Sequence, residues 1–382
     1  MKLTKIAIVH DWLTSSRGAE RCLEVFCELF PDADLFSLLH SPGTVSSTIE
    51  RMKIRTSFIQ HFPLAKRFYR YYLPFFPMAI ERFDFRGYDL ILSSSHCVSK
   101  GAMRPPGALH LSYTYTPMRY AWDLYDAYFG SRFGALRHFI TRRIMAHLRQ
   151  WDLAACQRVD HFMAISQNVA DRIRRHYKRD ACVIYPPVDG ERFTVSQDRS
   201  DYYLVVSALV PYKRIDLALE AFNRLELPLK IIGWGPEEGR LRKIAGSTVE
   251  FLGKQTDEEI SRYYAYCRAV IFPGEEDFGI VPLEAQASGK PVIAYGKGGA
   301  LETVIPINPL SQSHTWSFDH PTGVYFYEQT PEALAEAVRF FENHNQQFEP
   351  KRLRDHALQF DRPIFKAKIQ SFIQEKWQAH AC

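Results

Sequence analysis

The chain has 382 residues, enough for two or three domains at about 150 residues each. Apolar residues make up 46% and charged residues 24%, a globular balance that excludes wholesale disorder. The net charge of +5 is uneven, because residues 1–190 carry 26 Lys/Arg against 17 Asp/Glu and residues 191–382 carry 22 against 26. Halves of opposite charge indicate that they face different partners.

The cysteines and the apolar runs predict a cytoplasmic protein. The seven cysteines are scattered and form no Cys-x-x-Cys pair, so we expect reduced thiols and neither a zinc site nor a disulfide framework. No run reaches the ~18–20 apolar residues of a membrane-spanning helix. A strand-like segment starts at Lys5, and no signal peptide is expected from this pattern.

Short apolar runs alternate with helical segments along the first half. We predict helices from about Gly18 to Phe30 and from Ala135 to Cys156. The predicted strands are Lys5–His10, Asp89–Ser93, His110–Tyr115, His161–Ile165 and Cys182–Tyr185.

A second series of the same kind follows residue 201. Its predicted strands are Tyr202–Ser207, Leu229–Ile232, Val249–Leu252, Ala269–Phe272, Pro291–Tyr295 and Gly323–Phe326. The alternation predicts an α/β protein with two doubly wound, Rossmann-like parallel-sheet domains.

The domain boundary is expected in a Pro- and Gly-bearing linker that begins at Pro186. We therefore assign residues 1–190 to the first domain and 191–362 to the second. Residues 363–382 are predicted to form an amphipathic helix that packs on its own domain or crosses to the first.

The most informative segment is acidic and runs from Phe272 to Ala285. It follows a predicted buried strand and opens a helix, and Glu276 and Glu284 stand eight residues apart. Ligands of open α/β sheets bind at the carboxyl ends of the strands, and carboxylates bind sugar hydroxyls strongly. The backbone N–H groups of residues 278–281 suit an anion. The alternative is that both glutamates are solvated charges at a helix start.

This segment resembles the Glu-x7-Glu signature of retaining GT-B glycosyltransferases of the glycosyltransferase-4 family. The resemblance extends over nearly the whole chain, and within the family Tyr88–Lys100 and Tyr113–Asp126 are most similar to bacterial O-antigen and exopolysaccharide mannosyltransferases. The other resembling segments are Pro186–Asp189, Val206–Leu219, Gly233–Pro236, Phe251–Gly253 and Gly298–Glu302.

The resemblance implies a donor site in the second domain. Glu284 would bind the ribose hydroxyls of a nucleotide sugar and Glu276 the hydroxyls of the donor sugar. The backbone of Phe278, Gly279, Ile280 and Val281 would hold the sugar and the diphosphate. No cofactor beyond this donor and no metal is implied.

Two basic residues are candidates for the diphosphate. Lys213 aligns with the lysine that the family uses there, and a fixed cation would stabilise the departing diphosphate. The family commonly has arginine where this chain has Ala208, and Arg214 could supply that charge. The alternative is that both are charges on a helix surface.

Candidates in the first domain lie after its predicted strands. Gly18 opens a helix in a segment that resembles the family's Gly-Gly-Ala-Glu-Arg loop, where glycine permits close approach of phosphate. Tyr115 stands where related sequences carry histidine beside the donor sugar, and a phenol that titrates near pH ~10 is a poor base. The candidate acceptor contacts are His10, Asp11, Arg119 and Asp123, with a surface role as the alternative for the last two.

Asp32-Ala33-Asp34 matches the Asp-x-Asp of metal-dependent glycosyltransferases only in its letters. It lies between the first helix and a strand, away from any nucleotide loop. We interpret it as a turn.

A basic, aromatic stretch runs from Arg51 to Arg86, with eight Lys/Arg, two Asp/Glu and ten Phe/Tyr, and residues 132–179 hold eleven basic and three acidic residues. This composition suits a membrane interface. The alternative is an aromatic core with solvated charges. Nucleic acid is not expected, because no motif for it appears and the second half is acidic.

These observations predict a metal-independent, retaining glycosyltransferase with donor and acceptor in a cleft faced by both domains. It would move a hexose, with mannose from GDP-mannose as the leading choice, to a glycan or polyprenyl-diphosphate-linked acceptor in bacterial surface polysaccharide synthesis. Alternatives are an inactive nucleotide-sugar-binding or glycan-binding subunit, which Ala208 and Tyr115 favour, and a UDP-sugar-dependent transferase. A phosphorylase-like enzyme is a weaker choice for so short a chain.

Overall fold

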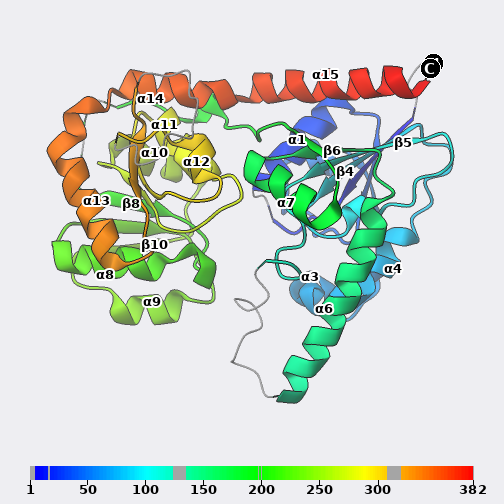
Figure 1. The fold of residues 1–382 in the computed structure, drawn as a ribbon, viewed down its shortest axis with the longest axis horizontal. Coiled ribbons are helices and arrows are strands. Elements are labelled where there is room, and N and C mark those ends of the chain that lie inside the picture. Colours follow the sequence, from blue (N-terminus) through cyan, green and yellow to red (C-terminus); the bar gives the residue numbers. More distant parts are fainter. Residues whose placement is uncertain are drawn as a thin grey trace. The chain divides into compact units, whose positions relative to one another are not determined.

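The computed structural model describes residues 5–15, 18–123, 135–196, 198, 200–307 and 320–381. The chain divides into two compact units, residues 1–186 with 365–382 and residues 187–364. Figure 1 shows that each unit is a sheet with helices on both faces. Each unit is described by itself below.

The first unit is built on a seven-stranded parallel sheet with the order β3-β2-β1-β4-β5-β6-β7. Chain order reverses between the neighbours β1 and β4, which makes that junction the topological switch point of the sheet. The strands are β1 (Ile6–His10), β2 (Asp34–Ser37), β3 (Lys53–Thr56), β4 (Leu90–Ser95), β5 (Leu109–Thr114), β6 (His161–Ala164) and β7 (Ala181–Val183).

Strand β4 shows how the sequence places polar groups at this junction. Its first half is apolar and its last three residues are serines, and all six residues are buried. Ser93 and Ser94 bond to histidines of the neighbouring strands, at 3.0 Å to His110 and 3.0 Å to His10. The carboxyl end of the sheet is therefore polar and internally hydrogen-bonded.

Helices cover both faces of the first sheet (Figure 1). One core cluster joins β1 and β4 to the segment of residues 58–81 and to α6. The α-helices of the unit are α1 (Gly18–Leu29), α2 (Ser47–Glu50), α3 (Ala65–Phe68), α4 (Phe76–Glu81), α6 (Ala135–Cys156) and α7 (Gln167–Tyr177), and the 3-10 helices are η1 (Phe58–His61), η2 (Tyr69–Phe75) and η3 (Ser99–Gly101).

The second unit has a six-stranded parallel sheet with the order β10-β9-β8-β11-β12-β13. Its switch point lies between β8 and β11. The strands are β8 (Tyr203–Val206), β9 (Leu229–Ile232), β10 (Val249–Gly253), β11 (Val270–Phe272), β12 (Val292–Tyr295) and β13 (Gly323–Phe326).

The core of the second unit lies between this sheet and α8, α9 and α13, whereas α10, α11 and α14 cover the opposite face in Figure 1. The α-helices are α8 (Ile215–Leu225), α9 (Glu238–Ile244), α10 (Asp257–Tyr266), α11 (Ile280–Ala287), α12 (Ala300–Thr303), α13 (Pro331–His344) and α14 (Pro350–Ala357). The 3-10 helices are η4 (Gly190–Arg192), η5 (Pro211–Lys213), η6 (Asn345–Gln347) and η7 (Leu358–Phe360).

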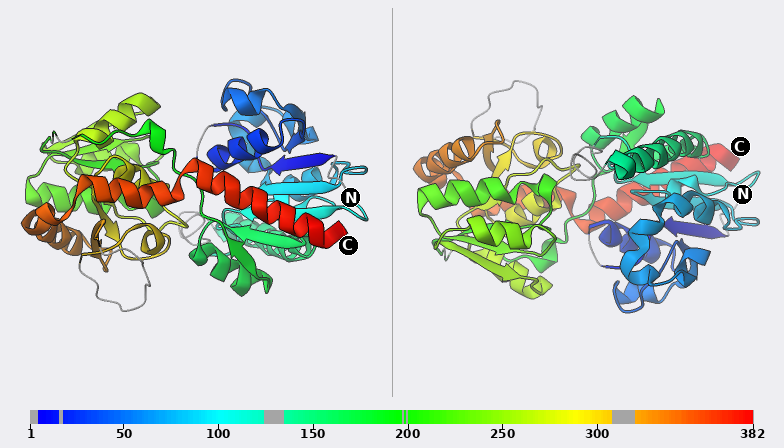
Figure 2. Two further views of the ribbon diagram at one scale, coloured as in Figure 1. Left: turned by 90° about the horizontal axis from the view of Figure 1, so that it is seen from above. Right: turned by 90° about the horizontal axis from the view of Figure 1, so that it is seen from below.

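The last helix, α15 (Arg362–Ala381), belongs to the first unit from Phe365 onward. Figure 2 shows it lying along the face of that unit that carries α1. The Phe365 ring lies 6.0 Å from that of Phe26 and 5.5 Å from that of Tyr113, between ring centroids. This apolar contact explains why the helix is amphipathic.

The unit boundary falls at Pro186, four residues before the predicted 190. The Val188 N–H donates to the Phe360 carbonyl at 2.9 Å, and the Gly190 N–H donates to the Asp361 carboxylate at 3.0 Å. These bonds tie residues 188–190 to the second unit.

The predicted strands and the three predicted helices all occur within two residues of their expected bounds. The bounds of the strands β2 and β3 were not predicted, since each has four residues and β3 alternates exposed and partly buried positions at the sheet edge. Within the described ranges, no helix combines the length and the apolarity needed to span a bilayer.

Candidate active site

The acidic segment lies at the carboxyl end of the second sheet. Strand β11 ends at Phe272, and α11 begins at Ile280 after Gly279, whose φ of +88° places it in the left-handed region. Glycine adopts this conformation without steric cost. The first N–H groups of α11 therefore lie at the carboxyl end of the sheet, where ligands of open α/β sheets bind.

Close backbone packing fixes the loop before α11. A Cβ on Gly274 would lie 2.9 Å from Lys213 Cα, and one on Gly298 would lie 2.5 Å from the Glu276 carbonyl oxygen. The Gly299 N–H donates to that same oxygen at 2.8 Å. Three segments that are distant in sequence thus hold Glu276 in place.

The two main catalytic candidates, Lys213 and Glu276, form an ion pair at this edge. Both side chains are partly exposed, at 17% and 18%. Lys213 ends η5, which follows β8, so the pair joins the ends of the two strands at the switch point. An anionic ligand here would meet a fixed ammonium group.

Glu284 is buried within α11 and has a defined partner. The Tyr264 hydroxyl donates to Glu284 Oε2 at 3.0 Å. Glu284 is 6% exposed and Tyr264, on α10, is fully buried. A solvated charge at a helix start therefore does not describe this carboxylate.

Arg214 differs from Lys213 in its surroundings. It adopts a left-handed conformation with φ +52°, and its guanidinium lies 3.3 Å from the Asp216 carboxylate two residues later. Phe278 is buried against Phe360, whereas Ile280 and Val281 are partly exposed at the start of α11. Lys213 thus lies beside the loop that precedes α11, whereas Arg214 pairs with Asp216.

Two further glycines bring a neighbouring loop against the η5 turn. A Cβ on Gly233 would lie 1.8 Å from the Ser207 carbonyl oxygen, and one on Gly235 would lie 2.3 Å from that of Leu209. Only glycine allows backbones to approach so closely. The predicted Gly-x-Gly-Pro turn is therefore packed on the segment that leads to Lys213.

In the first unit, His10 and Tyr115 lie at the carboxyl ends of β1 and β5, with Ser94 between them. Ser94 Oγ is 3.0 Å from His10 Nδ1 and 2.9 Å from the Tyr115 hydroxyl. That hydroxyl also donates to the Ala19 carbonyl at 2.9 Å. Burial raises the pKa of Tyr115 well above its ordinary value, so its phenol stays protonated and is unsuited to act as a base.

Asp11 is fully buried and serves the backbone of the next loop. It accepts four N–H groups, from His96 and Cys97 at 2.8 Å, Val98 at 2.7 Å and Ser99 at 2.8 Å. Burial acts to raise its pKa, but the nearby histidines and these N–H groups lower the pKa of Asp11 below its ordinary value. This carboxylate holds the loop, so it does not have the free oxygen expected of an acceptor contact.

The remaining first-unit candidates are spread out. Gly18 starts α1 with open space beside its Cα, where a Cβ would meet nothing within 4 Å. Asp123 pairs with Arg172 at 3.1 Å and with His176 at 3.1 Å. Burial acts to raise the pKa of Asp123, but these partners lower it. Arg119 is partly buried in the turn after β5.

The first unit also contains a buried ion pair that the sequence analysis did not predict. Lys100 Nζ lies 2.6 Å from Asp152 Oδ1, and both side chains are fully buried. Asp152 also accepts from Trp122 Nε1 at 2.8 Å and from the Tyr177 hydroxyl at 2.7 Å. The pair anchors α6 and α7 to the loop that Asp11 holds.

Asp34 of the Asp-x-Asp segment lies at the amino end of β2, where two basic side chains pair with it. Its carboxylate lies 3.4 Å from Lys53 Nζ and 3.1 Å from Arg55 Nη2, and it also accepts from Tyr88. In the described ranges, no three His, Cys, Asp or Glu side chains are arranged to hold a metal ion.

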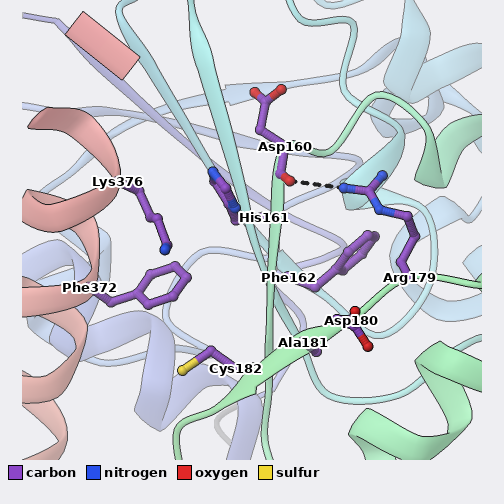
Figure 3. Close-up of a pocket in the computed structure, with 9 residues that line it drawn as sticks. All are labelled: Asp160, His161, Phe162, Arg179, Asp180, Ala181, Cys182, Phe372 and Lys376. Atoms are coloured by element: carbon purple, nitrogen blue, oxygen red, sulfur yellow. Dashed lines mark hydrogen bonds between the residues drawn. The ribbon is translucent and has the colours of Figure 1, made fainter. Parts of the chain in front are cut away.

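A cavity of about 440 Å³ in the first unit lies at the other end of the sheet. Figure 3 shows Phe372 and Lys376 of α15 facing the start of β6 and β7, with the Arg179 guanidinium bonded to the Asp160 carbonyl at 2.9 Å. His161 and Ala181 are the first residues of their strands. The cavity is thus remote from the polar carboxyl ends that carry the candidate residues.

Two family models match the chain and together span most of it. Residues 16–192 match Glycosyltransferase Family 4, and residues 191–358 match Glycosyl transferases group 1. The junction lies in the segment that links the two units.

Curated relatives align with part of the chain. The O-antigen chain mannosyltransferase C of Escherichia coli is 28% identical over 176 residues, which cover 41% of this chain and 44% of that protein. A GDP-mannose-dependent monoacylated alpha-(1-6)-phosphatidylinositol monomannoside mannosyltransferase of Corynebacterium glutamicum is 36% identical over 120 residues, 27% of this chain and 32% of that protein. The chain thus spans less than half the length of these relatives.

Solved structures match the whole chain in fold. Anabaena HepE in complex with UDP superposes with a TM-score of 0.70 at 17% identity, and the match covers 97% of this chain and 100% of that one. The likeness at this identity is one of architecture.

Proposed function

We propose that this chain, which belongs to the group 1 and family 4 glycosyltransferases and has the GT-B fold, is a hexosyltransferase. It transfers a hexose from a nucleotide sugar to a hydroxyl of a glycan or lipid-linked acceptor. The observation that carries the proposal is the Lys213–Glu276 pair beside the start of α11. A cation, a carboxylate that can accept hydroxyls and the N-terminal N–H groups of α11 there suit a sugar diphosphate.

Each side chain has a role that follows from its position. Lys213 stabilises the charge that develops on the diphosphate as the glycosidic bond breaks, which lowers the barrier more than it strengthens ground-state binding. Glu276 accepts hydroxyls of the transferred sugar. Glu284, held by Tyr264, accepts the ribose hydroxyls.

We propose retention of configuration without a metal ion. The departing diphosphate takes the proton of the acceptor hydroxyl, which attacks from the same face of the sugar. Two features support this. The Tyr115 phenol has its hydroxyl bonded to Ala19 and Ser94, and Asp34 is engaged by Lys53 and Arg55 rather than open to a cation.

GDP-mannose is the proposed donor, because the mannosyltransferase relatives from Escherichia coli and Corynebacterium glutamicum favour it. The UDP complex of Anabaena HepE supports a UDP-sugar as the alternative. Ala208, in place of a phosphate-binding arginine, favours a binding subunit without turnover.

A membrane-borne acceptor in bacterial surface polysaccharide synthesis suits one face of the first unit. Residues 58–80 and 135–151 together hold seven Lys/Arg and no Asp or Glu. Both segments border the same core cluster, and the Trp151 indole donates to Glu81 of α4 at 2.8 Å. The exposed apolar side chains of this face are Leu64, Phe68, Tyr71, Phe75, Met78, Phe139 and Ile140.

We call these segments the basic aromatic face. Cations with exposed aromatic rings suit the headgroup region of an anionic membrane. A peripheral position on the cytoplasmic side would bring the enzyme to a polyprenyl-diphosphate-linked acceptor.

The test is release of nucleoside diphosphate by the purified protein from GDP-, UDP- and ADP-sugars, with a glycan acceptor and with EDTA present. We expect GDP-mannose turnover that EDTA leaves unchanged and that Glu276→Ala abolishes while the melting temperature stays the same. Binding that raises the melting temperature without any turnover would establish the inactive subunit instead.

A further inference from the structure

An imidazole that the family resemblance does not assign lies at the switch point of the first sheet. His96 directly follows β4, between His10 at the end of β1 and Tyr115 just after β5. Its ring centroid lies 6.0 Å from that of His10 and 6.2 Å from that of Tyr115. The three rings thus form a row along the carboxyl ends of adjacent strands, where open α/β sheets bind ligands.

His96 is the open member of this row. The His10 side chain is fully buried and Tyr115 is 9% exposed, whereas the His96 side chain is 25% exposed. The Tyr115 hydroxyl is already bonded to Ala19 and Ser94. The imidazole of His96 is therefore better placed than the phenol to meet a ligand.

The ring of His96 is held from one side. Its Nδ1 is buried and lies 3.2 Å from Asp11 Oδ2, and the Trp12 ring meets the imidazole edge-on at 4.4 Å between centroids. The other ring nitrogen, Nε2, lies on the edge of the ring away from Asp11. An ionised carboxylate beside Nδ1 favours a proton there and leaves Nε2 as a hydrogen-bond acceptor.

A purely structural role does not account for this side chain. Asp11 holds the loop through the backbone N–H groups of residues 96–99, and any residue at position 96 would supply its N–H. The imidazole adds its Nδ1 contact with Asp11 to these bonds, and that contact does not use Nε2. A partly exposed ring that Asp11 and Trp12 hold in one orientation is the arrangement expected of a side chain that contacts a ligand.

We propose that His96 Nε2 accepts a hydrogen bond from a hydroxyl of a reacting sugar, taking the place that the buried Tyr115 phenol does not fill. This inference rests on the proposed glycosyltransferase function. The shared chemistry is a sugar hydroxyl, and its source is either the transferred hexose or the acceptor.

The test compares His96→Ala and His96→Gln with the wild type, and with His380→Gln as a control for loss of an exposed imidazole. We expect His96→Ala to lower transfer about 100-fold, His96→Gln to retain more activity, and added imidazole to restore part of the loss in His96→Ala. Stabilisation of the protein by nucleoside diphosphate should not change, because the groups proposed to bind it lie in the second unit.

Donor hydrolysis without acceptor identifies the sugar. If hydrolysis falls with transfer, the hydroxyl belongs to the transferred hexose, and if only transfer falls and the acceptor KM rises, it belongs to the acceptor. Transfer by both variants within threefold of the wild type would overturn the assignment of His96 alone. Absence of turnover in the wild type with every donor would overturn the proposed function with it. His96→Gln serves as the test if His96→Ala does not fold.

Discussion

The ammonium of Lys213 is paired with the carboxylate of Glu276, although 63 positions separate them in the sequence. The pair brings a cation for phosphate and an acceptor for hydroxyls to the same edge of the second sheet. A sugar diphosphate would therefore meet both groups at once, with the negative diphosphate drawing Lys213 from its carboxylate partner.

Replacing Lys213 by Ala should lower turnover by about 10²–10³-fold, because a fixed charge that stabilises the leaving diphosphate is lost. Lys297 offers a matched control, since it pairs at 3.1 Å with the adjacent Glu275 and is more exposed. Lys297→Ala should keep activity within about twofold, in line with the small energy of exposed ion pairs. Initial rates of diphosphate release are measured for both variants. An equal loss of activity in Lys213→Ala and Lys297→Ala would contradict the role of Lys213.

Tyr264→Phe should weaken donor binding about tenfold, because it removes a hydrogen bond of about 1.4 kcal/mol to the Glu284 carboxylate. The control is Tyr202→Phe, which removes a 2.8 Å bond to the Tyr263 carbonyl on the same helix. That change should leave the donor Kd unaltered. Calorimetric titration with the nucleotide sugar measures both, and an unchanged Kd in Tyr264→Phe would argue against a ribose-binding Glu284.

Tyr115→Phe should reduce transfer by less than about fivefold, since the phenol remains protonated and is used to bind Ala19 and Ser94 rather than substrate. We expect the substitution to lower the free energy of unfolding by about 1–2 kcal/mol, because the buried hydrogen bonds of the hydroxyl are lost. Urea unfolding and turnover are measured on the same preparation. A hundredfold loss of transfer with an unchanged free energy of unfolding would indicate that Tyr115 takes a direct part in the reaction.

The double variant Phe68→Ser with Tyr71→Ser should reduce binding to vesicles that contain anionic phosphatidylglycerol, because it removes two exposed rings from the basic aromatic face. Tyr327→Ser, at an exposed ring of the second unit, is the control. Co-sedimentation measures binding, which added salt should weaken. The membrane surface would be contradicted if the double variant bound anionic vesicles as well as the wild type does. It would also be contradicted if the wild type bound neutral vesicles as well as anionic ones.

Folding stability should fall as the pH drops from about 6.5 toward 4. Burial lowers the pKa of His110 to about 4, so the folded state holds this ring neutral while the unfolded chain takes up a proton below its ordinary pKa of 6.5. The stabilisation is complete above pH 6.5 and declines by about 3 kcal/mol on reaching pH 4.

The variant His110→Asn isolates this contribution. It should be less stable at pH 7, since it loses the contacts with Ser93 and Arg158, but its stability should depend less on pH in that window. His147→Gln should keep the wild-type slope. Urea unfolding at several pH values gives the slopes, and parallel curves for His110→Asn and the wild type would refute the assignment.

Much of the architecture was predictable because parallel sheets buried on both faces leave continuous apolar runs in the sequence. The acidic segment could be predicted for a related reason, because its loop follows such an apolar run and its glycines mark tight backbone contacts. The confirmed family and fold rest on these local signals.

What the sequence could not supply is the identity of contacts between distant segments. Asp11 and His96 both follow predicted strands, but only the folded loop shows that the first holds four N–H groups while the second stays open. Nothing near Glu284 in the sequence points to Tyr264, and Lys100 and Asp152 are 52 positions apart. Such partners depend on how whole elements pack.

Helix α15 has a consequence for the order of events during synthesis. The first unit needs Phe365 to cover Phe26 and Tyr113, and Ile369 and Phe372 of the same helix are also buried, so its core stays incomplete until the ribosome has passed these codons. All buried residues of the second unit are made before that point. The second unit can therefore mature on the nascent chain while the first still exposes an apolar face, which makes the earlier-translated half the later one to finish folding and the one in greater need of chaperones.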